Sequence, residues 1–431
     1  MEPPTISPMP PLATKVRLPW DAAVVDPVSS LAEARTSLGD TFVVDSGEDR
    51  YLFLFSPRGV AEFYALPEAV ASKGVADWRM LRRKLPDEMF VGRRVLPNQL
   101  FGREDVALYL RNVTMALETT VEELGSQGEV DVFVLSRRLG HRIGLASWGG
   151  PKSAIGDRFE QLVAAFDVLD GSDSFVHPDA MAAVASSGKS AEYEALDVIT
   201  STFARALDDL PGAEMQHPLF ARIASAWSDE STERRRVGLG LDLALIHIAS
   251  MSNVFAALGW ALIDLLAHPG PAGRVRDGDR GLAEACALES IRLAQRSIMA
   301  RYVLKPMSLD VGPCIHEVPP GVTVATLLPL TNSSAAPGFE RWDPNHWKGR
   351  RLAEVSKLAT VELVTSFGHG RHTCPAQPFA LSAMTTAVTV LLTEFEMAAL
   401  WSEQPVPVPA QIGGVARAAG PCPMHYRRVV Q

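Results

Sequence analysis

The longest apolar run in the chain, LALIHIASMSNVFAALGWALIDLLAH, spans Leu243–His268 and constrains the fold more than any other segment. As an α-helix it would be about 37 Å long at 1.5 Å per residue, enough to cross a bilayer or a large soluble domain. The polar side chains in it include His247, Asn253 and Asp264. We therefore expect a buried central helix in a soluble domain, with no membrane anchor and at most peripheral membrane contact.

The composition is typical of a soluble protein with a large core. The 431 residues are 47% hydrophobic and 21% charged, as in ordinary globular domains. A formal net charge of −9 argues against nucleic-acid binding, which requires a basic surface. The four cysteines form no Cys-x-x-Cys pair, and their spacings fit neither a zinc site nor a disulfide framework. Single thiols suit a reducing compartment, so we expect a cytoplasmic protein. From the net charge, we expect that it binds no nucleic acid.

Helical patterns dominate the chain. Residues 1–20 predict a proline-rich N-terminal arm, and residues 21–431 contain no linker long enough to divide them. A β-hairpin is expected over residues 41–56, and an ordered coil over residues 319–349. Helices are expected at residues 58–66, 107–124, 130–146, 158–169, 192–210, 219–268, 281–303 and 376–400, with a final hairpin in the C-terminal tail. The fold class is mainly α with a small β-rich portion, in a single catalytic domain that follows the arm.

The segment SFGHGRHTCPAQPFA, residues 366–380, concentrates reactive side chains before a predicted helix. Gly368 and Gly370 let the backbone fold tightly around a bulky group, and His372 can pair with an anion. The helix expected after Cys374 directs its N-terminal N–H groups and positive dipole end at the sulfur. That environment favours a thiolate, which could act as a nucleophile, a redox thiol or a metal ligand.

The spacing Phe-Gly-x-Gly-x-His-x-Cys-Pro-Ala closely resembles the heme-binding signature of the cytochrome P450 family. The resemblance implies heme b as the cofactor, with the Cys374 thiolate as the axial ligand of iron. It also implies that Phe367 packs against the heme near the sulfur, that the two glycines make room for the porphyrin, and that His372 contacts a propionate. The glycine that usually stands two residues after the cysteine is replaced by Ala376.

Further elements follow in the order expected for this family. Glu289 and Arg292 make its Glu-x-x-Arg pair, and these positions share one helix face. In the family an arginine in a later segment completes a Glu-Arg-Arg network. Alignment of WDPNHW puts His346 at that position, and Arg341 is the alternative. With the central helix and the LLAHP that ends it, the resemblance covers residues 240–390 specifically, and the rest of the chain less specifically.

The central helix departs from the usual pattern of the family. Most oxygen-activating members carry an acid followed by threonine over the heme, and these two side chains relay protons while the O–O bond breaks. In this chain the run ASMSN puts Ser252 at the acid position and Asn253 at the threonine position. A hydroxyl or an amide orients water but does not titrate at neutral pH. An alternative for Asn253 is a polar group hydrogen-bonded inside the core.

Members with asparagine near the threonine position fall into two groups. Prostacyclin synthase and allene oxide synthase rearrange or dehydrate peroxides without O₂, whereas the sterol hydroxylases of bile-acid synthesis are monooxygenases. Arg111, on an early helix, is the residue we expect at a heme propionate. His247 lies six residues before Asn253 and is expected to be a core histidine rather than an iron ligand.

The resemblance therefore implies a heme-thiolate monooxygenase that oxidises a hydrophobic small molecule, such as a lipid, a sterol-like compound, a terpenoid or a secondary metabolite. Its electrons would come from a separate ferredoxin or flavoprotein. The alternative is a non-oxygenating or peroxide-using enzyme, meaning an isomerase, a dehydratase or a peroxygenase. A heme protein without turnover fits the thiolate motif less well. The largely apolar pocket is expected to draw on residues 70–105, 165–220 and 302–307 and on the central helix.

Overall fold

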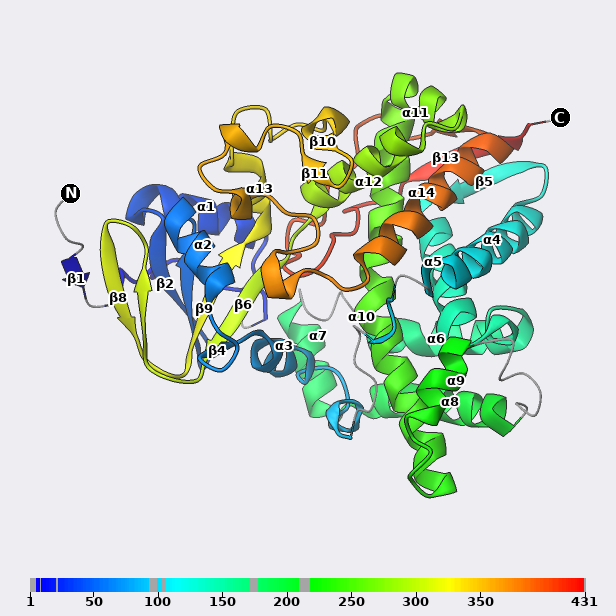
Figure 1. Cartoon of the computed structure of the whole chain (residues 1–431), viewed down its shortest axis with the longest axis horizontal. Coiled ribbons are helices and arrows are strands. Elements are labelled where there is room, and N and C mark those ends of the chain that lie inside the picture. Colours follow the sequence, from blue (N-terminus) through cyan, green and yellow to red (C-terminus); the bar gives the residue numbers. More distant parts are fainter. Residues whose placement is uncertain are drawn as a thin grey trace.

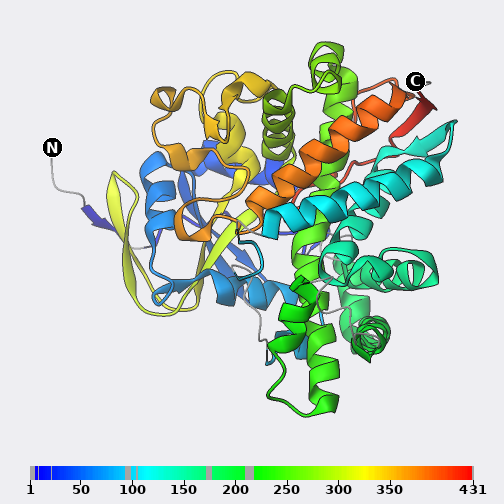
Figure 2. The same ribbon diagram turned by 45° about the vertical axis from the view of Figure 1, so that its right-hand side comes forward.

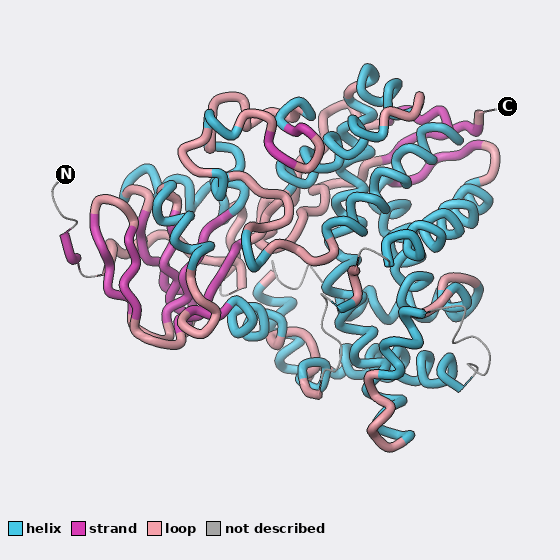
Figure 3. The backbone as a smooth tube through the Cα atoms, in the orientation of Figure 1, coloured by secondary structure: helices cyan, strands magenta, loops and turns pink. Residues whose placement is uncertain are grey.

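The computed structural model describes residues 5–7, 9–20, 22–92, 99–102, 105–170, 177–208 and 218–429. Most strands gather toward the N-terminal side and most helices lie on the other side, where the β12-β13-β5 sheet is also found near the C-terminus (Figures 1 and 3). This arrangement confirms the predicted fold class, mainly α with a small β-rich portion. The helices are α1 (Pro27–Leu38), α2 (Pro57–Ala65), α3 (Lys73–Leu81), α4 (Asp105–Leu124), α5 (Val132–Trp148), α6 (Gly156–Asp170), α7 (Pro178–Ser186), α8 (Ser190–Asp208), α9 (Pro218–Ser225), α10 (Thr232–Ala267), α11 (Pro269–Arg276), α12 (Arg280–Ala294), α13 (Leu328–Ser334) and α14 (Gln377–Glu394).

The strands form small sheets around one larger sheet. Its order is β2-β3-β9-β6-β4, and β9 runs parallel to β3 and antiparallel to β6. Every residue of β9 is buried, as expected for a central strand. The strands are β1 (Thr5–Ser7), β2 (Thr41–Ser46), β3 (Asp49–Leu54), β4 (Ala71–Ser72), β5 (Gln127–Asp131), β6 (Ile298–Val303), β7 (Met307–Asp310), β8 (Cys314–Val318), β9 (Val322–Leu327), β10 (Trp347–Lys348), β11 (Arg351–Leu352), β12 (Phe395–Ala399) and β13 (Pro423–Arg428).

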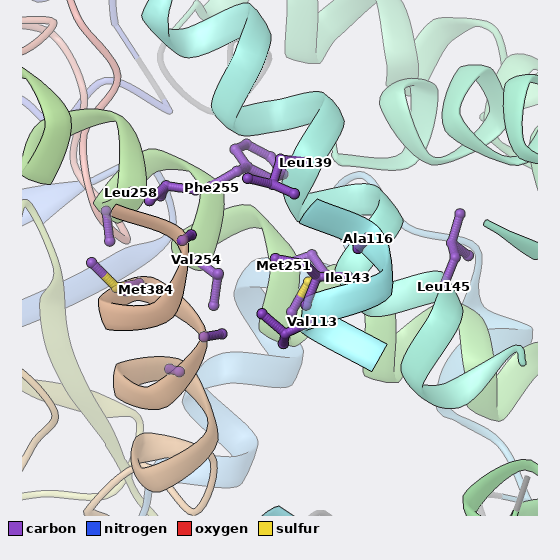
Figure 4. Close-up of a cluster of buried hydrophobic side chains, with 14 of the residues drawn as sticks. Val113, Ala116, Leu139, Ile143, Leu145, Met251, Val254, Phe255, Leu258 and Met384 are labelled. Carbon is purple, nitrogen blue, oxygen red and sulfur yellow. The ribbon is translucent and has the colours of Figure 1, made fainter. Parts of the chain in front are cut away.

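Helix α10 is the buried central helix that the sequence predicts. It is 36 residues long and ends where Pro269 follows. In the described part of the chain it is the one helix apolar and long enough to cross a bilayer, and 67% of its most apolar window is buried inside the protein. Its side chains interdigitate with those of α5: Gly140 lies so close to Phe255 that an added Cβ would be 2.8 Å from the Phe255 Cβ. Figure 4 shows Leu139 and Ile143 of α5 beside Met251 and Phe255 of α10.

Three predicted helices were wrong in extent. The helix expected over residues 219–268 is divided into α9 and α10 by a polar turn, and the Ser231 side chain caps α10. The helices expected over residues 281–303 and 376–400 end at Ala294 and Glu394, and the chain continues as strands β6 and β12. Pairing with distant strands therefore overrides the local helical pattern.

Two other regions also differ from the prediction. The expected coil over residues 319–349 contains β9 and α13. The final hairpin is present only as a short antiparallel bridge between Pro407 and Ala418, with the N–H of Val408 donating to the carbonyl of Arg417 and the N–H of Ala419 to that of Val406 (both 2.8 Å). The chain after it forms β13, which lies between β12 and β5 in a three-stranded sheet. In the N-terminal arm, Leu18 and Trp20 are buried in a hydrophobic cluster with residues of β2 and β3, so residues 9–20 pack against the sheet.

Candidate active site

Cys374 lies at the end of a glycine loop, just before α14. Its backbone N–H donates to the carbonyl of Phe367 (2.8 Å), which closes the loop. Gly368 has φ +79°, and a Cβ there would lie 2.6 Å from the carbonyl oxygen of His372. Gly370 also has positive φ (+59°), but a Cβ there would have no neighbour within 4 Å. Of the two glycines, Gly368 is thus the one that the close approach of the backbone requires.

Two opposing effects act on the Cys374 sulfur. Burial raises the pKa of the thiol, whereas the backbone N–H groups of Ala376 and Gln377 and the ammonium of Lys73 act to lower it. The net direction is upward in the protein alone. N–H groups from the start of α14 aimed at sulfur, in a half-buried position, suit a thiolate whose negative charge is shared with a bound cation.

The cysteine loop is anchored to α12 by three side chains. Ser366 Oγ donates to the carbonyl of Leu288 (2.9 Å), and Gln295 Nε2 donates to the carbonyl of Ser366 (3.2 Å). Asn332 on α13 donates from Nδ2 to the carbonyls of Arg292 and Thr365 (both 3.0 Å), and its Oδ1 accepts from the N–H of Thr365 (2.8 Å). The sequence reasoning missed Asn332, because its partners are backbone atoms at least 33 residues away.

Glu289 and Arg292 form a fully buried ion pair on α12. Arg292 donates to both carboxylate oxygens of Glu289, from Nη2 (2.6 Å) and Nε (2.8 Å). Its remaining N–H groups reach the carbonyls of Asn332 (3.0 Å) and Phe339 (2.7 Å). Burial acts to raise the pKa of Glu289, but the hydrogen bond and charge of Arg292 and the His346 contact outweigh it, so the pKa is lowered. The pair ties α12 to the segment that precedes the cysteine loop.

The residue that joins this pair from the later segment is His346. Its Nδ1 lies 2.8 Å from Glu289 Oε1, at the position where the family usually has arginine. Trp347 Nε1 donates to the other carboxylate oxygen (2.9 Å). Arg341, the alternative from the sequence, has an exposed side chain that pairs with Glu340, and only its carbonyl reaches Arg292. The alternative assignment of Arg341 was therefore wrong.

Arg301 on β6 provides the test of whether the site fits an anionic cofactor. Its side chain is buried, and Nη1 donates to the carbonyls of Leu66 (3.0 Å) and Ala71 (3.2 Å). Its Nη2 is buried and has no hydrogen-bond partner in the described residues. The Glu68 carboxylate lies beside both groups, 3.8 Å from Arg301 Nη1 and 4.0 Å from His372 Nε2. Burial and then the Arg301 charge lower the pKa of His372. A buried guanidinium N–H without an acceptor is costly, and a heme propionate would supply that acceptor.

Arg111 does not join this cluster. It is exposed on α4, where its guanidinium lies 3.5 Å from the Ala107 carbonyl of its own helix. The basic groups around the cysteine loop are instead Arg301, His372 and Lys73. The sequence reasoning missed Arg301, although an arginine in the otherwise apolar strand IMARYV was a usable signal. Helix α4 itself packs along α14 (Figure 2).

The middle of α10 opens to solvent although the helix is buried on both sides of this point. Ala249 and Asn253 are exposed and Ser252 is half-buried, whereas His247 and Met251 are buried. Asn253 Oδ1 accepts a hydrogen bond from the backbone N–H of Val415 (2.8 Å). The structure thus places the two residues of the predicted oxygen-activation position at an accessible point of the core helix.

Parts of the expected pocket, residues 93–98, 103–104, 171–176 and 209–217, lie outside the described residues. Phe367, expected beside the sulfur, is partly buried and packs against the main hydrophobic core. A small, partly open pocket lies between α3 and the five-stranded sheet, and its charged lining includes Asp49, Arg79 and Arg83. It differs from the apolar pocket that the sequence predicts.

Comparison with known proteins agrees with this geometry. No family model matches the chain. The chain is 21% identical to human 24-hydroxycholesterol 7-alpha-hydroxylase over 438 residues, which cover 93% of this chain and 89% of that protein. It is 27% identical to mouse cytochrome P450 7B1 over 183 residues, 35% of this chain and 36% of that one. Among solved structures, CYP175A1 from Thermus thermophillus superposes with a TM-score of 0.66 at 20% identity, over 93% of this chain and 95% of the other.

The fold is thus that of a cytochrome P450. The similarity to curated cytochrome P450 hydroxylases supports a member of the cytochrome P450 family and an oxidoreductase of that type. The family implies a heme iron with a thiolate ligand.

Proposed function

We propose that this protein is a heme-thiolate monooxygenase that hydroxylates a hydrophobic, sterol-like small molecule. The observation that carries the proposal is the position of Cys374. It lies just before α14, where the backbone N–H groups of Ala376 and Gln377 act to lower the pKa of the thiol, in a glycine loop that the buried Glu289–Arg292 pair and Asn332 hold in place. The unpaired Nη2 of Arg301 supports an anionic cofactor beside that loop.

Each residue of the site has a distinct role in this proposal. Cys374 would ligate the iron of heme b, and the heme, when bound, supplies the redox chemistry that activates O₂. Arg301 and His372 would hold a propionate by charge-assisted hydrogen bonds. Phe367 would keep water away from the sulfur. Ser252 and Asn253, on α10, orient water or a ligand oxygen but do not titrate at neutral pH.

The similar proteins favour a sterol-like substrate. The relative aligned over most of this chain is named for 7-alpha-hydroxylation of 24-hydroxycholesterol. Asparagine near the usual threonine position occurs both in sterol hydroxylases and in peroxide-rearranging enzymes, and this relative belongs with the hydroxylases. We propose a ferredoxin or flavoprotein as the separate electron donor, and a cytoplasmic location.

One observation favours the alternative, a peroxide-using enzyme. Neither Ser252 nor Asn253 is an acid, and the Asn253 oxygen is already occupied by the Val415 N–H. The described residues therefore show no titratable side chain at the two positions where the family usually has a proton relay. An enzyme that receives its oxygen already reduced, as a peroxide, needs less proton delivery.

Turnover with defined oxidants separates the two functions. Purified heme-loaded protein is incubated with a sterol panel, either with NADPH, a ferredoxin and its reductase, or with hydrogen peroxide alone. We expect a product with one added oxygen atom in the first reaction, and isotopically labelled O₂ should deliver that atom. Product formed only with peroxide would reject the monooxygenase and support the alternative. Omitting the ferredoxin is the control for electron supply.

A further inference from the structure

The segment 411–415 forms a rigid turn against the chain that follows α12. The N–H of Gly413 donates to the carbonyl of Arg296, and the N–H of Arg296 donates back to the carbonyl of Gly414 (both 2.8 Å). The side chain of Gln411 closes the turn from inside, with Nε2 donating to the carbonyls of Gly413 (2.9 Å) and Val415 (3.2 Å). The backbone N–H of Val415 is thus held in a fixed direction.

That N–H is the hydrogen bond donor to Asn253 Oδ1 (2.8 Å). Since a backbone N–H can only donate, the oxygen of the carboxamide must face Val415 and the NH₂ group must face elsewhere. Asn253 is exposed at the middle of α10. Within the described residues no hydrogen bond engages its NH₂ group, so that group remains available to a ligand or water.

Gly414 makes this contact possible. It has φ +62°, and a Cβ there would lie 2.6 Å from Asn253 Oδ1 but 3.9 Å from Nδ2. Any side chain at this position would push the carboxamide oxygen away from its donor. A glycine is thus required both by the backbone conformation and by the approach of Asn253.

We propose that the Gly413–Val415 turn is the positioning element for Asn253. It fixes the carboxamide so that Asn253 presents its N–H donors to a ligand or water oxygen at the centre of α10. The identity of the ligand in this inference rests on the proposed function. The orientation of the Asn253 side chain does not. The position that usually relays protons in the family becomes, in this chain, a fixed hydrogen-bond donor.

The orientation is tested first by hydrogen exchange of the Val415 amide, which needs no catalytic turnover. In the holoprotein, Asn253→Ala should speed the exchange of this amide roughly tenfold, because one hydrogen bond is lost. Asn253→Asp keeps an acceptor oxygen and should leave the exchange nearly unchanged. Unchanged exchange in Asn253→Ala would overturn the proposed contact.

The direction of the NH₂ group is tested by the C–O stretching frequency of the CO-bound ferrous protein. A nearby N–H donor lowers this frequency, so Asn253→Asp, which removes the donor but keeps the Val415 bond, should raise it. Gly414→Ala should also shift the frequency, because it displaces the same carboxamide. Gly349→Ala is the control for backbone strain, since Gly349 has a similar φ (+58°) and an added Cβ there meets nothing within 4 Å.

An unchanged frequency in Asn253→Asp, with a normal thiolate spectrum, would contradict the proposal. If the CO complex instead lacks the thiolate spectrum in the wild-type protein, the proposed function fails, while the Val415 exchange still decides the orientation of Asn253. The two failures are therefore distinguishable.

Discussion

His141 on α5 and His247 on α10 stack inside the core with ring centroids 5.1 Å apart. A hydrogen bond of 2.9 Å joins Nδ1 of His141 to Nε2 of His247. Trp148 Nε1, which can only donate, is bonded to Nδ1 of His247 (3.1 Å). His247 therefore carries its proton on Nε2 and donates to His141, whose own Nε2–H donates to Asp167 (3.1 Å). Every ring nitrogen is satisfied with both histidines neutral.

This row of hydrogen bonds from Trp148 to Asp167 predicts that the free energy of unfolding depends on pH. Burial, and then the neighbouring His141, lower the pKa of His247 far below 6.5. The unfolded state then binds a proton near pH 6.5 that the folded state does not, so stability is complete above that pH and falls as the pH decreases below it. We expect a loss of about 1.4 kcal/mol per pH unit from this group. In urea unfolding measured at several pH values, the free energy of unfolding should fall less steeply with decreasing pH in His247→Gln than in wild type. In the exposed His177→Gln it should fall as steeply as in wild type.

The buried Glu289–Arg292 pair on α12 predicts that a substitution of nearly equal volume has a large effect on the free energy of unfolding. Glu289→Gln removes the charge opposite Arg292 while keeping the volume, and it should lower the free energy of unfolding by about 3–5 kcal/mol. Glu340→Gln, at an exposed pair, is the matched control and should have little effect. His346→Arg should retain the contact with Glu289. A small loss of stability in Glu289→Gln, measured by urea unfolding, would contradict this view of the pair.

The two glycines of the cysteine loop should respond differently to alanine. Gly368→Ala puts a Cβ against the carbonyl oxygen of His372, whereas Gly370→Ala meets no atom within 4 Å. Both have positive φ and share the backbone cost. We expect a several-fold lower heme content per protein, measured by the pyridine hemochrome assay, in Gly368→Ala only. Equal heme contents in the two variants would argue against a close approach at Gly368.

The Nη2 group of Arg301, which has no hydrogen-bond partner in the described residues, predicts which arginine retains the cofactor. Arg301→Met keeps most of the buried volume but removes the donors that would meet a propionate, and it should increase heme loss several-fold. Arg111→Ala, on the exposed face of α4, should leave heme retention unchanged. Transfer of heme to apomyoglobin measures both rates. Faster loss from Arg111→Ala than from Arg301→Met would restore the assignment made from sequence.

The fold class, the central helix and the first hairpin could be predicted from the sequence because each depends on a local pattern. The boundaries of α12 and α14 could not. No glycine or proline marks a break after Ala294 or Glu394, and pairing with β9 and with β13 makes the following residues strands. Helix propensity cannot detect a partner that lies far away in the sequence.

The residues of the candidate site also fall into those that a local sequence pattern marks and those that it does not. Cys374, Glu289 and Arg292 lie in short spacings that a sequence displays directly. Arg301 and Asn332 act through backbone carbonyls and buried surroundings, which depend on tertiary packing. The contact of Asn253 with Val415 joins residues 162 positions apart, and no local pattern marks it.

The central claim is that Cys374 is the thiolate ligand of a heme iron. The most direct measurement is the absorption spectrum of the reduced, CO-bound protein in wild type and in Cys374→Ala, with Cys286→Ala as the control for an unrelated buried thiol. We predict the strongly red-shifted band of a thiolate-ligated heme in wild type and Cys286→Ala, and its loss in Cys374→Ala. A red-shifted band that persists in Cys374→Ala would contradict the account.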